Sequence, residues 1–433
     1  MNDSHSDAAR WPRRTVLTTG LAGAAATVLP GCSPGSASRG TTGGQELSVL
    51  LLGPSDQTVR FFTETVIPRF ADDTGITVSL QQSDWGSGFQ KVLTAAASGT
   101  LTDLLMLGGI WTAPLAAKQA LLPLDELLGD YGDLDAFYPA MLEDCRYDGK
   151  TYGLPLYSDT RTALYRKSHL EQAGLDPDRL PKSWDDYAEA ARRLGADGPA
   201  DFPVDWSQDK SVGLQQTFAQ LFLQAGGSYY DDAGRATFAS DAGVRALEFM
   251  ISFYADKLAS PDLVNTGSGA SPFTRGRSSM IFSGLSAIKN ARDNLAEAVD
   301  DIVVGTPLSA DPSGRPVTSA WINKIGISAK TKNRDGAWRL LQFLVSADIA
   351  VTFDEQYGGL PARTDLAEAG YLKDLSPNLV RAAESIVPQP PHPNMLTIAP
   401  QITTHLQQAI RLSGTPKEIL TALDAKLNEI NGV

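Results

Sequence analysis

Cysteine and histidine are scarce in this sequence of 433 residues. The two cysteines, Cys32 and Cys145, are too few for a disulfide framework, so hydrophobic cores must hold the fold together. No two of the four histidines stand three or four residues apart. We therefore expect no zinc or non-haem iron site, and nothing else in the sequence indicates a metal or another cofactor.

Positive charge is also in deficit. The chain has 37 Lys and Arg residues against 50 Asp and Glu, a net charge of −13, and it has no block of basic residues. This composition argues against binding to nucleic acid or to an anionic membrane surface. Hydrophobic residues make up 42% and charged residues 20%, as in ordinary globular proteins, which excludes a wholly disordered chain. The length predicts two or three domains.

The common catalytic motifs give no support for an enzyme. No predicted strand is followed by a G-x-S-x-G nucleophile elbow or by G-x-G-x-x-G, and no S-x-x-K motif occurs with its companion motifs. Gly149-Lys150-Thr151 resembles the end of a phosphate-binding loop, but Asp144 stands where that loop needs glycine. Asp148-Gly149 is instead typical of a hairpin turn. A secreted hydrolase acting on glycans stays an alternative, because missing motifs do not exclude catalysis.

The first 45 residues predict export. Residues 1–31 resemble a twin-arginine signal peptide, with Arg13-Arg14 followed by an uncharged run, Thr15–Leu29, that is too short to span a bilayer. Leu29-Pro30-Gly31-Cys32 resembles the lipobox of bacterial lipoproteins, which implies cleavage before Cys32 and lipid attachment to its thiol. Residues 32–45 are a flexible tether rich in Gly, Ser and Thr. The alternative is a plain secretory signal, exported by either route, with an incidental cysteine.

Strands and helices alternate after the tether. Predicted strands at 46–53, 76–81 and 103–107 alternate with helices at 56–74 and 89–97, a pattern that favours an α/β layer with a parallel sheet. Cys145 has no partner if Cys32 is acylated, so we expect a buried small hydrophobic residue there. Further helices are expected at 183–194, 213–225, 240–257, 335–346, 348–357 and 401–412.

Four tryptophans lie near predicted strand ends or in neighbouring loops: Trp85, Trp111, Trp206 and Trp321. Ligands of α/β proteins bind in loops at the carboxyl ends of the strands, and flat aromatic faces suit the C–H surfaces of sugar rings. The alternative for each tryptophan is that it fills a gap beneath a loop. Trp338 has the spacing of a helix core residue instead.

Several segments in a fixed order carry a resemblance to a known family. The most specific is Asp148–Leu194, with DGKTYGLPLYSDTRTALYRKSHLEQAGLD followed by PKSWDDYAEAARRL. GRSSMIFSG at 276–284, GTPL at 305–308 and GGLPAR at 358–363 follow it. Together they resemble family 1 of the extracellular solute-binding proteins, the maltodextrin-binding-like lipoproteins of carbohydrate ABC importers. Arg166 departs from the family pattern, at a position that is normally structural.

The resemblance implies a two-lobed α/β fold of the periplasmic-binding-protein type II, with the ligand in a cleft between the lobes and three hinge crossings. The crossings are expected near Tyr157–Ser158, Thr306–Leu308 and Gly359–Arg363. Domain I would comprise residues 46–157 and 308–360, and domain II residues 158–307 and 361–433.

The implied function is capture of a sugar or oligosaccharide and its delivery to the membrane permease subunits of an ABC importer. We expect a lipid-anchored monomer on the outer face of the cell membrane, with no nucleic-acid partner. The same fold could bind a charged solute, such as a polyamine or a phosphate ester. For Asp56, helix N-capping is an equal alternative to binding. The expected ligand-binding residues are Asp56, Asp84, Trp85, Trp111, Tyr157, Asp159, Trp206, Ser283, Gly284, Ser319, Trp321 and Arg363.

Replacing Trp321 tests the expected stacking role of the tryptophans. Trp321→Ala should weaken sugar binding by about 1–3 kcal/mol, because an aromatic face against a sugar is lost. Titration calorimetry against the bound sugar measures the change. An unchanged affinity would remove Trp321 from the site.

Overall fold

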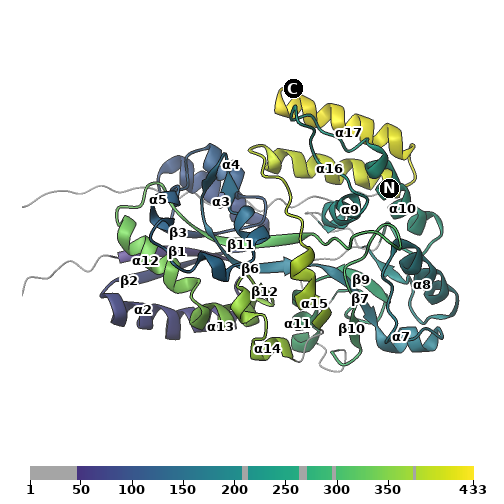
Figure 1. Ribbon diagram of the computed structural model, residues 1–433, viewed down its shortest axis with the longest axis horizontal. Coiled ribbons are helices and arrows are strands. Elements are labelled where there is room, and N and C mark those ends of the chain that lie inside the picture. The colour runs from purple at the N-terminus through teal and green to yellow at the C-terminus, as the bar shows by residue number, and fades with distance from the viewer. Residues whose placement is uncertain (1–45, 207–212, 263–270, 295–298, 374–376) are drawn as a thin grey trace, which may run out of the picture. The chain divides into compact units, whose positions relative to one another are not determined.

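Two β-sheets organise the chain (Figure 1). The computed structural model describes residues 46–433 except 207–212, 263–270, 295–298 and 374–376. The predicted signal peptide (1–31), the tether (32–45) and Cys32 lie outside the described residues. We call the six-stranded sheet with its covering helices the first lobe, and the four-stranded sheet with its helices the second lobe.

The six-stranded sheet of the first lobe is mixed, with strand order β12-β6-β11-β3-β1-β2. β1 is parallel to β2 and β3, as the sequence predicts, but β11 is antiparallel to both β3 and β6, and β12 is antiparallel to β6. The parallel pairing is therefore confirmed for the three predicted strands, whereas β11 and β12 run in the opposite direction. The strands are β1 (Glu46–Leu52), β2 (Thr77–Ser83), β3 (Leu104–Leu107), β6 (Leu154–Thr160), β11 (Ala320–Ile327) and β12 (Leu360–Pro361).

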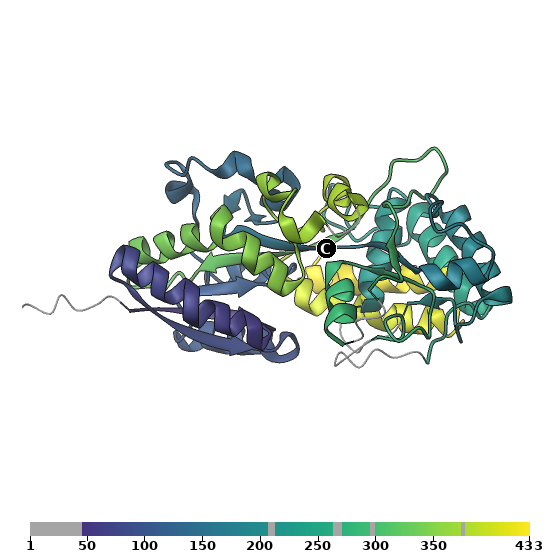
Figure 2. The ribbon, with the colours of Figure 1, turned by 90° about the horizontal axis from the view of Figure 1, so that it is seen from below.

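A long helical segment covers one side of this sheet. It runs from α1 (Asp56–Phe61) through a π-helical turn (Phe62–Val66) into α2 (Ile67–Thr74), as the predicted helix at 56–74 requires. The π-helical turn precedes Pro68, which has no N–H to donate within a regular helix. Figure 2 shows α2 beside α12 (Arg334–Leu344) and α13 (Ala347–Tyr357). The Phe62 and Phe353 rings, 5.6 Å apart, pack these helices together.

The remaining elements of the first lobe are short, apart from α3. The predicted hairpin forms, because Asp148 and Gly149 both take positive φ values, 49° and 72°, as a two-residue turn of this type needs. Cys145 is fully buried, as predicted. These elements are α3 (Trp85–Ser98), α4 (Thr112–Ala117), α5 (Asp125–Leu128), a 3₁₀ turn (Leu134–Ala136), α6 (Pro139–Glu143), β4 (Arg146–Tyr147) and β5 (Lys150–Thr151).

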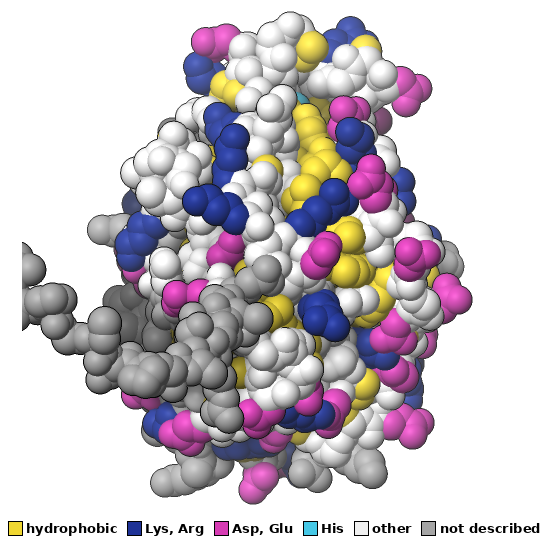
Figure 3. Space-filling model, turned by 90° about the vertical axis from the view of Figure 1, so that its left-hand side faces the viewer, with side chains coloured by type: hydrophobic (Ala, Val, Ile, Leu, Met, Phe, Trp, Pro, Cys, Tyr) yellow, Lys and Arg dark blue, Asp and Glu magenta, His cyan; other side chains and the backbone are white. Residues whose placement is uncertain are grey.

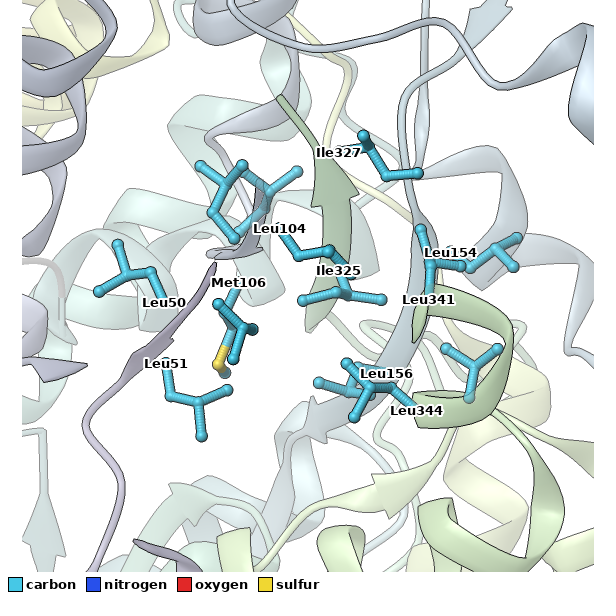
Figure 4. Close-up of a cluster of buried hydrophobic side chains, with 14 of the residues drawn as sticks. Leu50, Leu51, Leu104, Met106, Leu154, Leu156, Ile325, Ile327, Leu341 and Leu344 are labelled. Carbon is cyan, nitrogen blue, oxygen red and sulfur yellow. The ribbon is translucent and has the colours of Figure 1, made fainter. Parts of the chain in front are cut away.

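Aliphatic side chains fill the first lobe between the sheet and its helices. Figure 4 shows leucines, isoleucines and Met106 from four strands in one buried cluster with Leu341 and Leu344 of α12. Each fully buried Leu or Ile contributes about 1.5–3 kcal/mol relative to exposure. The strand residues labelled there are Leu50, Leu51, Leu104, Met106, Leu154, Leu156, Ile325 and Ile327.

The second lobe is built on the sheet β10-β7-β9-β8. Its core is rich in aromatic rings, among them Tyr187, Phe222 and Phe253. α8 starts where the sequence predicts a helix at 183–194, with a capping box in which Ser183 and Asp186 exchange hydrogen bonds. The strands are β7 (Thr162–Arg166), β8 (Val204–Asp205), β9 (Met280–Ser283) and β10 (Ile302–Val304). The helices are α7 (Lys167–Gln172), α8 (Trp184–Asp197), α9 (Gly213–Gln224), α10 (Asp241–Ala255), α11 (Leu285–Asn294), α14 (Gly370–Lys373), α15 (Pro377–Ala382), α16 (Met395–Ile410) and α17 (Pro416–Asn431). The 3₁₀ turns at Thr364–Leu366 and Ala383–Ser385 pack against the first lobe.

The chain passes between the two sheets several times. β6 of the first sheet leads directly into β7 of the second, with Arg161 between them. The return runs from β10 to β11, and Leu308 on this path is still buried in the core of the second lobe. After β12 the chain runs on to α16 and α17, which pack on α9 and α10 of the second lobe. The predicted domain boundaries stay a prediction.

The surface at the free end of the first lobe carries charges of both signs. In Figure 3 this end faces the viewer, and Lys and Arg side chains lie among Asp and Glu around a strip of hydrophobic side chains. Such a mixed surface presents no single-sign field on this face. Among the described residues, no helix combines the length and the apolar character needed to cross a membrane.

One carboxyl group in the first lobe is buried without compensation. Asp354 of α13 is 0% exposed, and neither of its oxygens has a hydrogen-bond partner within the described structure. Burial raises the pKa of Asp354 well above its usual value of 3.8. The native state therefore keeps this proton at pH values where the unfolded chain has lost it. The contribution of this carboxyl group to the free energy of unfolding is fully present below the pKa that it has in the unfolded chain. It is lost as the pH rises through the pKa that it has in the folded protein.

Asp354→Asn tests this burial cost. The amide cannot ionise, so the variant should gain about 1–3 kcal/mol of stability at neutral pH, and the gain should shrink towards about pH 4. Denaturant unfolding across that pH range measures it. Glu355→Gln, on the exposed side of the same helix, is the control and should show no such gain. A variant less stable than the unchanged protein at neutral pH would contradict the assignment.

Candidate functional site

A cavity of about 180 Å³ lies where elements of the two lobes meet. The first lobe contributes the turn after β1 and the end of α13, and the second lobe contributes α11. The lining is therefore drawn from both sides of the boundary that the chain crosses, which is where a ligand could hold the lobes together. The lining residues are Gly53, Ser55, Ser286, Lys289, Asn290, Gln356 and Tyr357.

The turn after β1 brings backbone against an aromatic ring. Gly53 has φ +57°, and a Cβ at this position would lie 2.5 Å from Nε1 of Trp85, so only glycine fits. The side chain of Ser55 accepts the N–H of Thr58 at 3.1 Å and caps α1. The N-capping alternative for Asp56 is therefore wrong. Asp56 is the exposed first residue of the helix, beside the cavity-lining Ser55.

Trp85 presents the most exposed aromatic ring of this region. It is 42% exposed at the start of α3, and its ring centroid lies 6.0 Å from that of Trp111 in an edge-on arrangement. Trp111 is only 6% exposed and packs edge-on against Phe89 at 5.0 Å. Trp111 therefore supports Trp85 from below, whereas Trp85 keeps a surface open to a ligand.

Arg161 contacts both Trp321 and Asp159. The Arg161 guanidinium lies over the Trp321 ring, 5.0 Å from its centroid, and Trp321 is 9% exposed. Arg161 also donates from Nε and Nη2 to one oxygen of Asp159, at 3.1 and 2.8 Å. The other oxygen, Oδ1, has no partner among the described residues, and a Cβ at Gly284 would lie 2.6 Å from it. The absent side chain at Gly284 thus leaves room beside a carboxylate oxygen that can still accept a hydrogen bond.

Tyr157 lies behind the cavity. Its ring stacks on that of the cavity-lining Tyr357, with centroids 5.0 Å apart, and it is 5% exposed. Burial raises the pKa of Tyr157 well above its usual range, so its hydroxyl stays protonated. Tyr357 in turn donates its hydroxyl to the carbonyl of Leu52 at 3.1 Å. The stacked ring of Tyr157 therefore holds the cavity-lining ring of Tyr357 in place.

Three further predicted residues hold local structure beside this region. Asp84 caps α3, accepting the N–H of Ser87 at 2.7 Å and its hydroxyl at 2.5 Å, and these bonds lower the pKa of Asp84. Ser283 ends β9, one residue before Gly284. Ser319 is fully buried and donates its hydroxyl to Gln220 at 3.3 Å, while its carbonyl accepts the N–H of Arg161.

Two predicted residues lie away from the cavity. Trp206 is 2% exposed in the aromatic core of the second lobe, and its ring centroid lies 4.5 Å from that of Phe253. Among the described residues Trp206 is thus enclosed by aromatic rings, which favours the alternative that it fills a gap beneath a loop. Arg363 is 4% exposed, and its guanidinium pairs with Asp133 at 2.5 Å and with Asp365 at 2.7 Å. Its guanidinium is thus engaged inside the first lobe, and this pairing does not favour the prediction that it binds ligand hydroxyls.

The cavity lining and the charged pair include residues that the sequence did not single out. Arg161 stands two residues after Asp159, and this spacing could have indicated a pair. Tyr357 precedes a Gly-Gly turn, but an aromatic residue at the end of a helix is a common feature of any core. α11 carries no motif that distinguishes Lys289 and Asn290 from other surface residues.

The chemistry available here is stacking and hydrogen bonding. An open indole ring, a free carboxylate oxygen and a guanidinium are groups that recognise a polar ring with an apolar face. Within the described ranges no cluster of three or more His, Cys, Asp or Glu residues could hold a metal ion. We find no activated nucleophile next to a base among the residues named for this region.

Comparisons with known proteins identify the family and the fold. The family model of bacterial extracellular solute-binding proteins matches residues 55–351, more than half of the chain. A putative binding protein of Brucella abortus is 25% identical over 386 residues, covering 87% of this chain and 91% of that protein. An ABC transporter solute-binding protein of Thermotoga lettingae, solved with α-D-tagatose, has a TM-score of 0.78 at 24% identity and covers 89% of this chain and 100% of its own.

A second solved structure has the same fold. The maltose-bound protein MalE3 of T. maritima has a TM-score of 0.76 at 22% identity, covering 89% of this chain and 100% of its own. The two-lobed type II architecture expected from the sequence is thus confirmed. With the family model matching most of both lobes, the chain belongs to the family of bacterial extracellular solute-binding proteins.

Proposed function

We propose that the protein captures a sugar or oligosaccharide outside the cytoplasm and delivers it to an ABC importer. The observation that carries this proposal is the half-exposed ring of Trp85 beside a cavity lined from both lobes. An indole face is suited to the C–H surface of a pyranose or furanose ring. Sugar ligands in the solved structures of similar fold, tagatose and maltose, support the same class of solute.

The proposed site combines stacking with charged hydrogen bonding. The sugar ring lies on Trp85, which Trp111 holds in place, and its hydroxyls reach Asp159, Arg161 and the lining of α11. Because Asp159 and Arg161 are already paired, the pair is neutral as a unit, and each charged partner still strengthens its hydrogen bonds about twofold. The predicted residues kept in this proposal are Asp56, Asp84, Trp85, Trp111, Tyr157, Asp159, Ser283, Gly284, Ser319 and Trp321.

Closure of the two lobes completes the proposed mechanism. A ligand seated on the first lobe gains contacts from α11 of the second lobe only when the lobes approach each other. Binding therefore shifts the equilibrium towards the closed form by the free energy of those added contacts. The permease subunits would receive the loaded, closed form. This is a binding function, and the site supports it without any catalytic step.

The proposal includes the predicted attachment to the membrane. Cleavage before Cys32 and acylation of its thiol would leave residues 32–45 as a leash for a monomeric body. Such a leash keeps the binding protein near its permease, which raises the effective concentration of one for the other.

A ligand panel tests the function. The chain after Cys32, residues 33–433, is unfolded thermally with mono-, di- and oligosaccharides, and with spermidine and glycerol phosphate as charged solutes. A specific ligand at 100 times its Kd should add about 2.7 kcal/mol of stability. A shift with one group of sugars supports the proposal. A shift only with a charged solute would replace the sugar by that solute, and turnover of a chromogenic glycoside would establish an enzyme instead.

Trp85→Ala tests the stacking surface itself. Loss of the indole face should weaken binding of the sugar found in the panel by about 1–3 kcal/mol, with little change in stability because the ring is half-exposed. Leu412→Ala removes another exposed apolar side chain, 53% exposed and just after α16, and serves as the matched control. Equal affinities of the Trp85 and Leu412 variants would place the ligand elsewhere.

A further inference from the structure

Lys324 is a fully buried cation in the middle of a buried strand. All eight residues of β11 are buried, and the Lys324 side chain is 0% exposed. Removing an ammonium group from water is costly, and a buried ion pair is often no more stable than apolar side chains of the same size. Stability alone therefore does not explain why this central strand carries a lysine.

The contacts of Lys324 lead to the loop after β3. Its Nζ pairs with Asp144, which follows α6, at 2.5 Å, and donates to the carbonyl of Gly109 at 3.0 Å. Gly109 belongs to the turn Gly108–Trp111, closed by a hydrogen bond from the Trp111 N–H to the Gly108 carbonyl at 3.0 Å. The Lys324–Asp144 pair thus restrains the backbone of this turn through the hydrogen bond to the Gly109 carbonyl.

The turn is a spacer between three tryptophans. A Cβ at Gly108 would lie 3.1 Å from Trp85 and 3.2 Å from Trp111, and a Cβ at Gly109 would lie 2.8 Å from Cδ1 of Trp321. A small shift of this backbone would therefore change its contacts with all three rings. Its position sets how far apart Trp85 and Trp321 stand.

Packing does not restrain the turn on every side. A cavity of about 20 Å³ borders Gly109, Thr112, Asp144 and Gln389. The hydroxyl of Thr112 and the amide of Gln389 are buried there, and neither has a hydrogen-bond partner within the part of the chain that the structure describes. The bond from Lys324 to the Gly109 carbonyl is thus a specific restraint at a loosely packed place.

We propose that Lys324, held by Asp144, is a positioning residue that fixes the Gly108–Trp111 turn and so the spacing of the tryptophans for the ligand. This inference rests on the proposed function for its effect on affinity. Its effect on the turn itself does not depend on any ligand. The pair therefore serves binding geometry rather than the stability of the fold.

The double variant Lys324→Met/Asp144→Leu tests the proposal. It removes both charges together, so neither is left buried alone, and its unfolding midpoint should equal or exceed that of the unchanged protein. Hydrogen exchange of the amides of residues 108–111 in the ligand-free protein should become about 10-fold faster or more. Affinity for the sugar found in the panel should fall about 10-fold or more.

A pair of the same kind in the second lobe gives the control. Arg166 and Asp301 are 2.6 Å apart with side chains 12% and 17% exposed. Arg166→Met/Asp301→Asn should leave the exchange of the turn and the ligand affinity unchanged. Gly109→Ala displaces the turn because its methyl group would clash with Trp321, while the Lys324–Asp144 pair is kept. This variant should reproduce the loss of affinity.

Unchanged exchange at residues 108–111 in the double variant would overturn the positioning role, with or without a ligand. Loss of stability throughout the protein, or failure of the double variant to fold while Gly109→Ala keeps its affinity, would show that the pair is merely structural. If no sugar shifts the unfolding of the unchanged protein, the proposed function fails, and the exchange measurement still decides the role of Lys324.

Discussion

The antiparallel pairing of β6 with β11 is the interaction on which the site depends. Ala320 pairs with Thr160 and Trp321 with Asp159, so two segments about 160 residues apart in sequence reach the boundary of the second lobe together. Beyond this pairing, β6 leads through Arg161 into β7 of the second sheet. The side chains that end the two strands, Asp159 and Trp321, are therefore held on the same ladder. A hinge made of paired strands can bend while the groups at its ends keep their register.

Glycine backbone shapes the region around these strand ends. At Gly53, Gly108, Gly109 and Gly284 an added Cβ would lie 2.5–3.1 Å from an aromatic ring or a carboxylate. The chain thus approaches Trp85, Trp321 and Asp159 more closely than any side chain would permit. This close approach buries one side of each group against the backbone. The aromatic and charged groups are fixed before a ligand arrives, so less ordering is required on binding.

Charge in this region is compensated locally. Asp159 is paired with Arg161, Asp144 with Lys324, and Arg363 with Asp133 and Asp365. A chain with a net charge of −13 thus presents a pre-formed neutral pair, rather than a single-sign field, where the proposed ligand binds. A neutral polyhydroxyl solute suits such a site better than an ion, because no uncompensated charge has to be neutralised by the ligand. The exception is Asp354, which has no such partner among the described residues; burial raises the pKa of its carboxyl group, which favours the neutral form.

The sequence by itself determined the local elements. Residue patterns predicted the helix over 56–74, the hairpin at Asp148-Gly149 and the start of α8 at Ser183. These features depend on neighbours within a few residues, so the amino-acid sequence is sufficient to find them. The order and spacing of longer segments also indicated the family.

Only the tertiary structure decided which of similar residues stay exposed and which are buried. Trp85 and Trp206 both follow predicted or observed strands, but Trp85 starts an exposed helix while α8 and α10 enclose Trp206. Arg363 stands after a Gly-Gly turn near an expected crossing, yet Asp133, 230 residues away in sequence, takes its guanidinium. The direction of β11 and the partner of Lys324 are set in the same way. Burial and pairing depend on elements that meet only after folding, and no local pattern contains that information.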